Sequence, residues 1–324
     1  TTDEIAQYLV NERELWFIPV VNPDGYVYNQ TIAPNGGGMH RKNRRDTGCG
    51  DGTQRGIDLN RNYGYEWGAD NSGSSPNPCS STFRGDSAFS EPETQAVRDF
   101  IFANEFSNVQ HYHSYSNVLI HSWGDGSLPA EPDLTTIREI GWEMTKFNGY
   151  QVGTGYETIQ YGVNGDAVDW SYGDAGLISY TPEVGSNQDL FWPPENRVIP
   201  LCQDQLYSNQ IFGFVGGADY TIYTAETEEQ QGDTIQFNIT IQNRGLQDSD
   251  GDVLVEALPY NNTSSILTYD NNAGPLAARS TSAINISMVT AGSLPNGSEV
   301  SMVITLNDNS SFVRTDTVTV ITGI

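Results

Sequence analysis

Polar side chains suited to acid–base and metal chemistry stand at the ends of apolar runs in the first two thirds of the chain. A histidine ends the run NVQHYH, and a glutamate follows the run GLISYTP. A histidine at a strand end can bind a metal through one ring nitrogen. A carboxylate there can take a proton from a metal-bound water and return it to a leaving amine. The whole set is His113, Glu183, Arg41, Asn60, Arg61 and Tyr161.

Each of these residues has a plainer interpretation when it is taken alone. An isolated histidine is more often a hydrogen-bonded structural group, and we leave His111 with that interpretation. A glutamate in a loop is usually solvated, and the basic cluster at 40–45 could form a surface of salt bridges. Arginine is, however, also the residue suited to bind a carboxylate with two hydrogen bonds or to stabilise an oxyanion.

The apolar runs that carry these residues predict an α/β domain with a mixed, mostly parallel sheet flanked by helices. Residues 15–21, LWFIPVV, are typical of a strand buried on both faces, and the turn signal NPDG follows them. Further along the chain, helical and strand-like periodicities alternate. We expect helices at 91–104, 132–148 and 194–213, and strands near 108–113, 117–123 and 176–182.

The pattern changes near Gly217 to a strict alternation of apolar and polar residues. Ile235, Phe237, Ile239 and Ile241 give one such run, and turn signals separate it from the next. Period-two runs of this kind predict a β-sandwich. We therefore expect two domains, an α/β domain at 1–217 and an all-β sandwich at 218–324.

Charge and cysteine content narrow the function classes. The net charge is −26 and the chain has two lysines, so a basic surface for nucleic acid or an anionic membrane is not expected. No apolar stretch is long enough to span a membrane, and strong acidity favours a soluble monomer. The chain starts at Thr1 without methionine or signal peptide, which we interpret as processing or trimming.

The cysteines predict a secreted protein, extracellular or periplasmic. Cys49 and Cys79 lie in polar, glycine-rich loops, and we expect them to form a disulfide in an oxidising compartment. Two unpaired loop thiols are the alternative. Cys202 lies in an amphipathic helical pattern, and we expect it to be a small buried apolar residue.

Seven motifs in register resemble the M14 family of zinc carboxypeptidases, the funnelins. Tyr161 lies nine residues before Trp170 and Glu183 thirteen residues after it, as in that family. Several motifs in the characteristic order are more specific than any single pattern. They are VVNPDGYVY (20–28), HRKNRR (40–45), GIDLNRNYGYEWG (56–68), FRGDSAFSEPET (83–94), HSYSN (113–117), VDWSY (168–172) and TPEVG (181–185).

The resemblance implies a metallocarboxypeptidase, which uses one zinc ion to hydrolyse the C-terminal peptide bond of peptides and proteins. It implies that His113 is a zinc ligand and that Glu183 is the general base and acid. It implies that Arg41, together with zinc, polarises the scissile carbonyl and stabilises the oxyanion. Asp58 resembles the carboxylate that orients a zinc-bound histidine.

The resemblance also implies which residues hold the substrate. Asn60, Arg61 and Tyr161 resemble the set that binds the free C-terminal carboxylate, with Tyr161 on a mobile loop that closes over it. Asp166 stands where related bacterial enzymes place an acid in the pocket for the terminal side chain. We expect it to favour C-terminal lysine or arginine, while Val168 leaves room for apolar residues. Other positions that resemble subsite-lining residues are Ser114, Tyr115 and Trp192.

The family pattern is incomplete in one respect. Its first two zinc ligands come as His-x-x-Glu, and none of the four histidines has a glutamate three residues later. Catalytic zinc needs three protein ligands, so we expect the other two upstream of Thr1 and the chain as given to be inactive. A cleaved N-terminal fragment is then a candidate partner. The alternative is a noncatalytic relative.

The expected sandwich resembles the immunoglobulin-like CARDB modules of secreted bacterial hydrolases, through QFNITIQNRGLQDSDGD. It could bind cell-surface material, assist secretion or stabilise the enzyme. Asp248, Asp250 and Asp252 have the alternate spacing of calcium loops, which makes Ca²⁺ a candidate ligand. A solvated acidic turn is the alternative.

Two other functions compete with the carboxypeptidase. One is an M14-type amidohydrolase acting on cell-wall peptides, and the other is a noncatalytic protein that binds peptides or polysaccharide. Asn60, Arg61 and Tyr161 favour recognition of a free α-carboxylate, and so favour the carboxypeptidase over the amidohydrolase.

Overall fold

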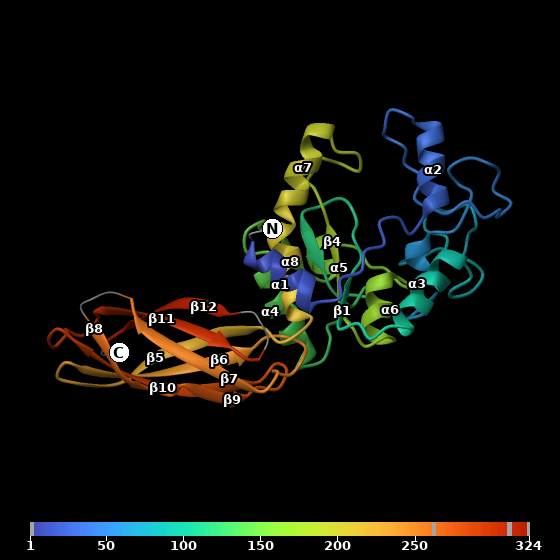
Figure 1. Cartoon of the computed structure of the whole chain (residues 1–324). Helices are drawn as coiled ribbons and strands as arrows, with labels where there is room; N and C mark the ends of the chain where they lie inside the picture. Colours follow the sequence, from blue (N-terminus) through green and yellow to red (C-terminus); the bar gives the residue numbers. More distant parts are fainter. Residues whose placement is uncertain (1–2, 261–263, 310–312, 323–324) are drawn as a thin grey trace. The chain divides into compact units, whose positions relative to one another are not determined.

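The computed structural model describes residues 3–260, 264–309 and 313–322 (Figure 1). Contacts between residues divide the chain into two compact units. One unit is Trp16–Phe212, and the other combines Thr1–Leu15 with Gly213–Ile324. The domain boundary expected at 217/218 stays a prediction.

A four-stranded mixed sheet forms the centre of the unit Trp16–Phe212. Its order is β1-β4-β2-β3, with β1 parallel to β4, β2 antiparallel to β4 and β2 parallel to β3. This confirms the predicted α/β class with a mixed, mostly parallel sheet. The strands are β1 (Asn108–Gln110), β2 (Val118–Ile120), β3 (Gln151–Gly153) and β4 (Ile178–Glu183).

Helices accompany this sheet, and close packing fixes the position of one of them. A side chain at Gly141 in α4 would lie 2.8 Å from Val152 and 3.5 Å from Tyr180, so glycine lets the helix approach the strands. The predicted helices at 91–104 and 132–148 are confirmed, and the one at 194–213 divides at Gln205. The helices are α2 (Pro23–Ile32), η1 (Leu59–Arg61), α3 (Pro92–Phe102), α4 (Asp133–Met144), α5 (Gly155–Thr158), α6 (Ala167–Gly173), α7 (Glu195–Asp204) and α8 (Leu206–Val215).

The apolar run at 15–21 is not a strand, so that prediction was wrong. Trp16 is 53% exposed and Phe17 82% exposed. A strand is stable only when a neighbour satisfies its backbone groups, and the described sheet edges β1 and β3 do not pair with this segment. The expected turn is the start of α2, where the Asn22 side chain accepts a hydrogen bond from the Gly25 backbone N–H at 3.0 Å.

A long irregular segment between α2 and α3 is held by a disulfide and a buried lysine. Cys49 and Cys79 are bonded, which confirms that prediction. Lys42 is 1% exposed, and its ammonium group donates to the carbonyls of Gln54, Pro78 and Ser80 at 2.6, 3.0 and 2.8 Å.

Cys202 is exposed in α7, so the expectation that it is buried was wrong. Its helix turns that position away from the apolar side, where Leu201 is buried.

The second unit holds two antiparallel sheets of four strands, a β-sandwich as predicted. Their orders are β5-β6-β10-β8 and β12-β11-β7-β9. The alternating residues predicted from the sequence, such as Ile235, Phe237 and Ile239, form its buried core. The strands are β5 (Tyr220–Gln231), β6 (Thr234–Asn243), β7 (Asp252–Pro259), β8 (Ser264–Tyr269), β9 (Asn272–Pro275), β10 (Thr281–Thr290), β11 (Glu299–Asn307) and β12 (Arg314–Ile321).

This second unit also contains α1 (Glu4–Glu12), whose Tyr8 and Leu9 pack with Phe214.

Of the aspartates considered for calcium, Asp248 accepts a hydrogen bond from the Ala278 backbone and Asp252 from the Asn272 side chain. Asp248 thus holds the loop at Ala278, and Asp252 joins the starts of β7 and β9. The described residues give calcium no support. Within the described ranges, no helix has the length and apolar character needed to cross a membrane.

Candidate active site

The parallel pairing of β1 and β4 brings His113 and Glu183 together. Gln110 lies opposite Tyr180, and an isolated parallel bridge then joins His113 to Glu183. The His113 backbone N–H donates to Pro182 O at 2.9 Å, and its Nδ1 lies 4.0 Å from Glu183 Oε1. The two side chains therefore lie on the same side of the sheet end, as the hypothesis of a shared site requires.

Burial tunes both groups toward acid–base and ligand chemistry. It lowers the pKa of His113 to about 4, and the nearby Arg41 charge contributes to that shift. At neutral pH the imidazole is therefore uncharged, which is the form that binds metals. Burial raises the pKa of Glu183 to about 7, against the opposing effect of Arg41. A carboxyl with a pKa near the working pH can accept and return a proton.

Asp58 joins Arg41 to the turn that carries the next site residues. The Arg41 Nη2 atom lies 3.1 Å from Asp58 Oδ2, and the carboxylate is 2% exposed. Asp58 also begins the 3₁₀ turn η1, where Oδ1 accepts a hydrogen bond from the Asn60 backbone N–H at 3.2 Å. In the described residues its ion-pair partner is Arg41, while its expected role toward a zinc-bound histidine stays a prediction.

Hydrogen bonds fix the two residues of that turn. The Asn60 side-chain oxygen accepts from the backbone N–H of Ala167 at 3.0 Å, which ties the turn to the start of α6. The Arg61 side chain is buried, with Nε donating to Gly73 O at 2.7 Å and Nη1 to Asn60 O at 2.6 Å. The guanidinium is thus held in one orientation before any ligand binds.

Arg41, Arg61 and Tyr161 line one cavity of about 400 Å³. Two guanidinium groups and a phenol give it the charge and the donors that a carboxylate needs. Tyr161 is 52% exposed, and the segment at 160–162 provides one wall. The structure therefore brings together three residues that span 120 positions of the sequence, from Arg41 to Tyr161.

Other predicted residues lie outside the lining of this cavity. Tyr115 packs edge-on against Phe191 at 4.9 Å, and Trp192 Nε1 donates to Gly38 O at 2.6 Å. Asp166 precedes α6 and is 4% exposed, while Val168 is 3% exposed. Burial raises the pKa of Asp166 to about 6, against the effect of Arg61. The lining also lacks Ser114, Asn60, His113 and Glu183.

Two residues near the site were missed in the sequence analysis. Tyr156 lines the cavity from the short helix α5, which begins with a capping box formed by Thr154 and Glu157. The box was visible in the sequence, but the side chain's direction was not. Asp169, in the motif VDWSY, is buried and lies near Asp166. Burial and the negative charge of Asp166 raise the pKa of Asp169 well above its ordinary value.

Zinc fits only part of this donor set. His113 offers one uncharged imidazole, but the described residues contain no group of three His, Cys, Asp or Glu side chains able to hold a metal ion. Catalytic zinc uses three protein ligands and a water. The described residues alone therefore do not make a zinc site.

Comparisons with known proteins identify the family of the chain. The family profile "Zinc carboxypeptidase" matches residues 1–208. The chain is 34% identical over 205 residues to carboxypeptidase B of Astacus astacus, covering 60% of this chain and 65% of that protein. It is 31% identical over 218 residues to human mast cell carboxypeptidase A, covering 63% of this chain and 49% of that protein.

The structural comparison gives the same family. The crystal structure of carboxypeptidase A from Helicoverpa armigera is 30% identical, with a TM-score of 0.52, over 60% of this chain and 49% of that one. This chain thus spans between about half and two thirds of the length of these relatives. Because the profile covers more than half of the chain, the chain belongs to the zinc carboxypeptidase family.

Proposed function

We propose that this chain forms the carboxylate-binding and acid–base part of a zinc carboxypeptidase that removes single residues from peptide C-termini. The observation that carries the proposal is the shared cavity of Arg41, Arg61 and Tyr161. An exopeptidase needs a fixed cation beyond the scissile bond, because the free carboxylate distinguishes a chain end from an internal peptide. The buried Arg61, held by two backbone carbonyls, suits that task.

The neighbouring residues then divide the chemistry. Arg61 and Tyr161 bind the terminal carboxylate, and Arg41 faces the carbonyl oxygen where negative charge develops. Glu183 holds the proton between the attacking water and the leaving amine. The family implies one zinc ion; we infer that His113 is one ligand and that the described residues do not supply the others.

Binding measurements test carboxylate recognition without requiring metal or turnover. We expect N-benzoyl-arginine to bind at least about tenfold more tightly than N-benzoyl-argininamide, which lacks the negative charge. Arg61→Gln should abolish that difference, while Arg98→Gln, in α3 and outside the lining of the cavity, should preserve it. Equal binding of acid and amide to the unchanged protein would refute the proposal.

Hydrolysis distinguishes an enzyme from a binding protein. With zinc supplied and all ligands present, Glu183→Gln should lower kcat by about 10²-fold or more, because the general base and acid is lost. Retained carboxylate binding with no zinc-dependent hydrolysis by such a complete enzyme would support the noncatalytic alternative instead.

Asp166 is proposed to favour basic C-terminal residues, with Val168 accommodating apolar ones. Asp166 is buried, its Oδ1 has no hydrogen-bond partner among the described residues, and its charge interacts with Arg61. We expect Asp166→Ala to lower the ratio of hydrolysis of substrates ending in Arg over those ending in Phe by about tenfold. An unchanged ratio would mean that Asp166 only positions Arg61.

The proposal also covers the cellular compartment of the protein and the role of its sandwich. The disulfide between Cys49 and Cys79 supports secretion, because such bonds persist in oxidising surroundings. We propose that the sandwich is an immunoglobulin-like accessory module of the CARDB type. A solved structure of the chain whose strand connections differ from that fold would remove this assignment.

A further inference from the structure

Asn62 caps the end of the turn η1, directly after Arg61, and it is fully buried. Its side-chain nitrogen lies within hydrogen-bond distance of three acceptors in the segment 84–90. They are Arg84 O at 2.9 Å, Ser87 O at 3.0 Å and Ser90 Oγ at 2.9 Å. The Asn62 amide therefore ties the turn that carries Arg61 to a segment 22 to 28 positions further along the chain.

The surrounding hydrogen bonds fix which way the amide of Asn62 faces. The Ser90 hydroxyl donates to Glu91 Oε1 at 2.7 Å, so its oxygen is left to accept from Asn62 Nδ2. On the other side, Asn62 Oδ1 accepts from the Thr94 hydroxyl at 2.8 Å and from the Glu91 backbone N–H at 3.3 Å. An apolar side chain of the same shape would leave these buried partners unsatisfied, which is costly. The environment is therefore specific for an amide.

A glycine gives the amide room to make these contacts. Gly85 has φ +85°, and a Cβ there would lie 2.8 Å from Asn62 Nδ2 and 2.5 Å from Ser90 Oγ. Only glycine accepts both this backbone conformation and this close approach. The Asn62 carbonyl also accepts from the Phe89 backbone N–H at 2.6 Å. The backbone and the side chain of Asn62 are thus both held by the same segment.

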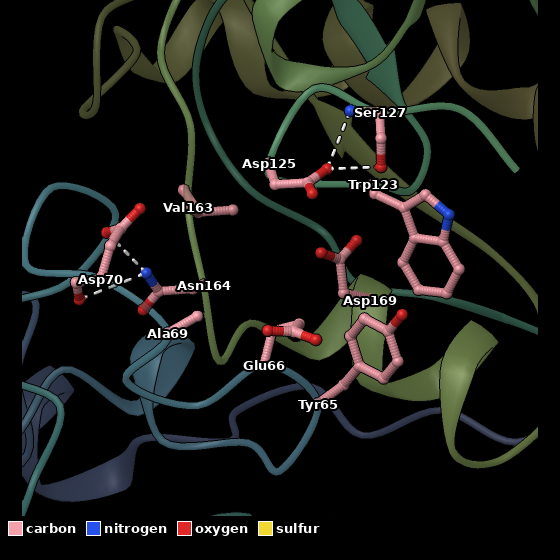
Figure 2. A pocket seen from close by; sticks show the side chains of 10 residues that line it. All are labelled: Tyr65, Glu66, Ala69, Asp70, Trp123, Asp125, Ser127, Val163, Asn164 and Asp169. Carbon is pink, nitrogen blue, oxygen red and sulfur yellow. Dashed lines mark hydrogen bonds between the residues drawn. The ribbon is translucent and has the colours of Figure 1, made fainter.

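The Arg61 guanidinium depends on a second fixed point, the loop 70–74. Its Nε donates to Gly73 O at 2.7 Å. Asp70 Oδ1 holds this loop, because it accepts from the Gly73 backbone N–H at 2.7 Å and from the Asn164 side chain at 2.9 Å. Figure 2 shows the contact between Asp70 and Asn164. The carbonyl that orients Arg61 therefore belongs to an ordered loop.

Arg84 joins the two fixed points. Its carbonyl accepts from Asn62 Nδ2, and its Nη1 donates to Asp70 O at 2.9 Å and to Ser74 Oγ at 3.2 Å. The backbone beside Arg61 and the loop at the tip of its side chain are thus connected through one pair of residues. We propose that Asn62 is a positioning residue, which together with Arg84 sets the orientation of the Arg61 guanidinium for the terminal carboxylate of a substrate.

This inference rests on the proposed function, in which Arg61 binds that carboxylate. Pairing a guanidinium with a carboxylate through two hydrogen bonds requires alignment. A displacement of about 1 Å can cost on the order of 10²-fold at a site that depends on such alignment. Asn62 lies outside the described lining of the cavity, so the effect of replacing it passes through Arg61.

The ratio of the Kd values for N-benzoyl-argininamide and N-benzoyl-arginine tests this role. Both ligands are titrated into the same sample of the full chain. Any unfolded fraction then weakens both titrations equally and leaves the ratio unchanged, so lost stability alone cannot move it. Asn62→Leu keeps the shape and the neutral charge of the side chain but removes its hydrogen bonds. Against a ratio of at least about tenfold for the unchanged chain, we expect less than about threefold for this variant, with circular dichroism showing that it is folded.

Thr94 offers a milder pair of variants. Thr94→Val removes the hydroxyl from which Asn62 Oδ1 accepts, and it should lower the ratio by about threefold. Thr94→Ser retains that hydroxyl and should keep the ratio of the unchanged chain. Thr145→Val removes another buried hydroxyl, which donates to Gly141 O at 3.0 Å away from the cavity, and should also keep the ratio.

The outcomes separate this inference from the proposed function. Equal binding of acid and amide by the unchanged chain overturns the proposed function, and this inference with it. If the unchanged chain discriminates and Arg61→Gln does not, a full ratio in folded Asn62→Leu overturns this inference alone. Should Asn62→Leu fail to fold, the Thr94 pair decides. A lower ratio for Thr94→Val than for Thr94→Ser supports the positioning role, and equal ratios overturn it.

Discussion

The two units of this chain differ in how much charge their interiors hold. The sandwich has an apolar core, in which residues such as Ile235, Phe237 and Met302 are fully buried. The unit Trp16–Phe212 instead buries charged side chains, among them Lys42 and Asp58. Buried charges cost free energy unless they are paired or hydrogen-bonded. The unit Trp16–Phe212 therefore retains costly groups where its candidate sites lie, while the sandwich unit, besides its apolar core, buries Asp219, which pairs with Arg244 and Arg314.

The largest expected effect tests whether the apolar core stabilises the sandwich unit. Phe237→Ala removes a fully buried ring and leaves a cavity, so it should lower the free energy of unfolding of this unit by about 3–5 kcal/mol. Leu258→Ala, whose side chain is about half exposed, should cost much less. Chemical denaturation measures both. A small effect of Phe237→Ala would show that the core does not stabilise this unit as described.

A smaller effect tests the polar interior of the other unit. Lys42→Met keeps most of the side-chain volume but leaves the carbonyls of Gln54, Pro78 and Ser80 without their donor. The free energy of unfolding should fall by about 2–3 kcal/mol. Lys146→Met, at an exposed position, should change it by less than about 0.5 kcal/mol. Equal stability of the two variants would contradict a structural role for the buried ammonium.

The smallest expected effect concerns Asp189, and it is lost in acid. Hydrogen bonds from Arg197 and Ser186 lower the pKa of Asp189 from its usual value. A depressed carboxylate pKa adds stability above the usual pKa of about 4, and this part is lost as the pH falls toward the folded-state pKa. Denaturation of the unchanged protein and Asp189→Asn should differ most above about pH 4 and converge below it. A difference that does not change with pH would contradict the assignment.

The sequence predicted most of what depends on local pattern. Alternation placed Ile235 and Phe237 inside the sandwich, and helical periodicity located α3 and α4. The prediction of a buried strand at Trp16 and Phe17 was wrong. An apolar run indicates burial, but it does not say which strand could pair with it. The prediction for Cys202 was also wrong, because the helix places the thiol on the exposed side.

The same distinction applies to the site. Motif order pointed to Arg41, Arg61 and Tyr161, which line one cavity in the structure. Tyr156 and Asp169 were missed because their contributions depend on how separate loops approach one another in space. No local pattern encodes the unpaired Asp169 oxygen or the stacked rings of Tyr65 and Trp123.

A crystal structure of the chain with N-benzoyl-arginine bound is the most direct test of the account. We predict that the ligand's carboxylate lies about 3 Å from the Arg61 guanidinium and beside the Tyr161 hydroxyl, within the cavity that Arg41 also lines. A ligand whose carboxylate contacts neither Arg61 nor Tyr161 would contradict the central claim.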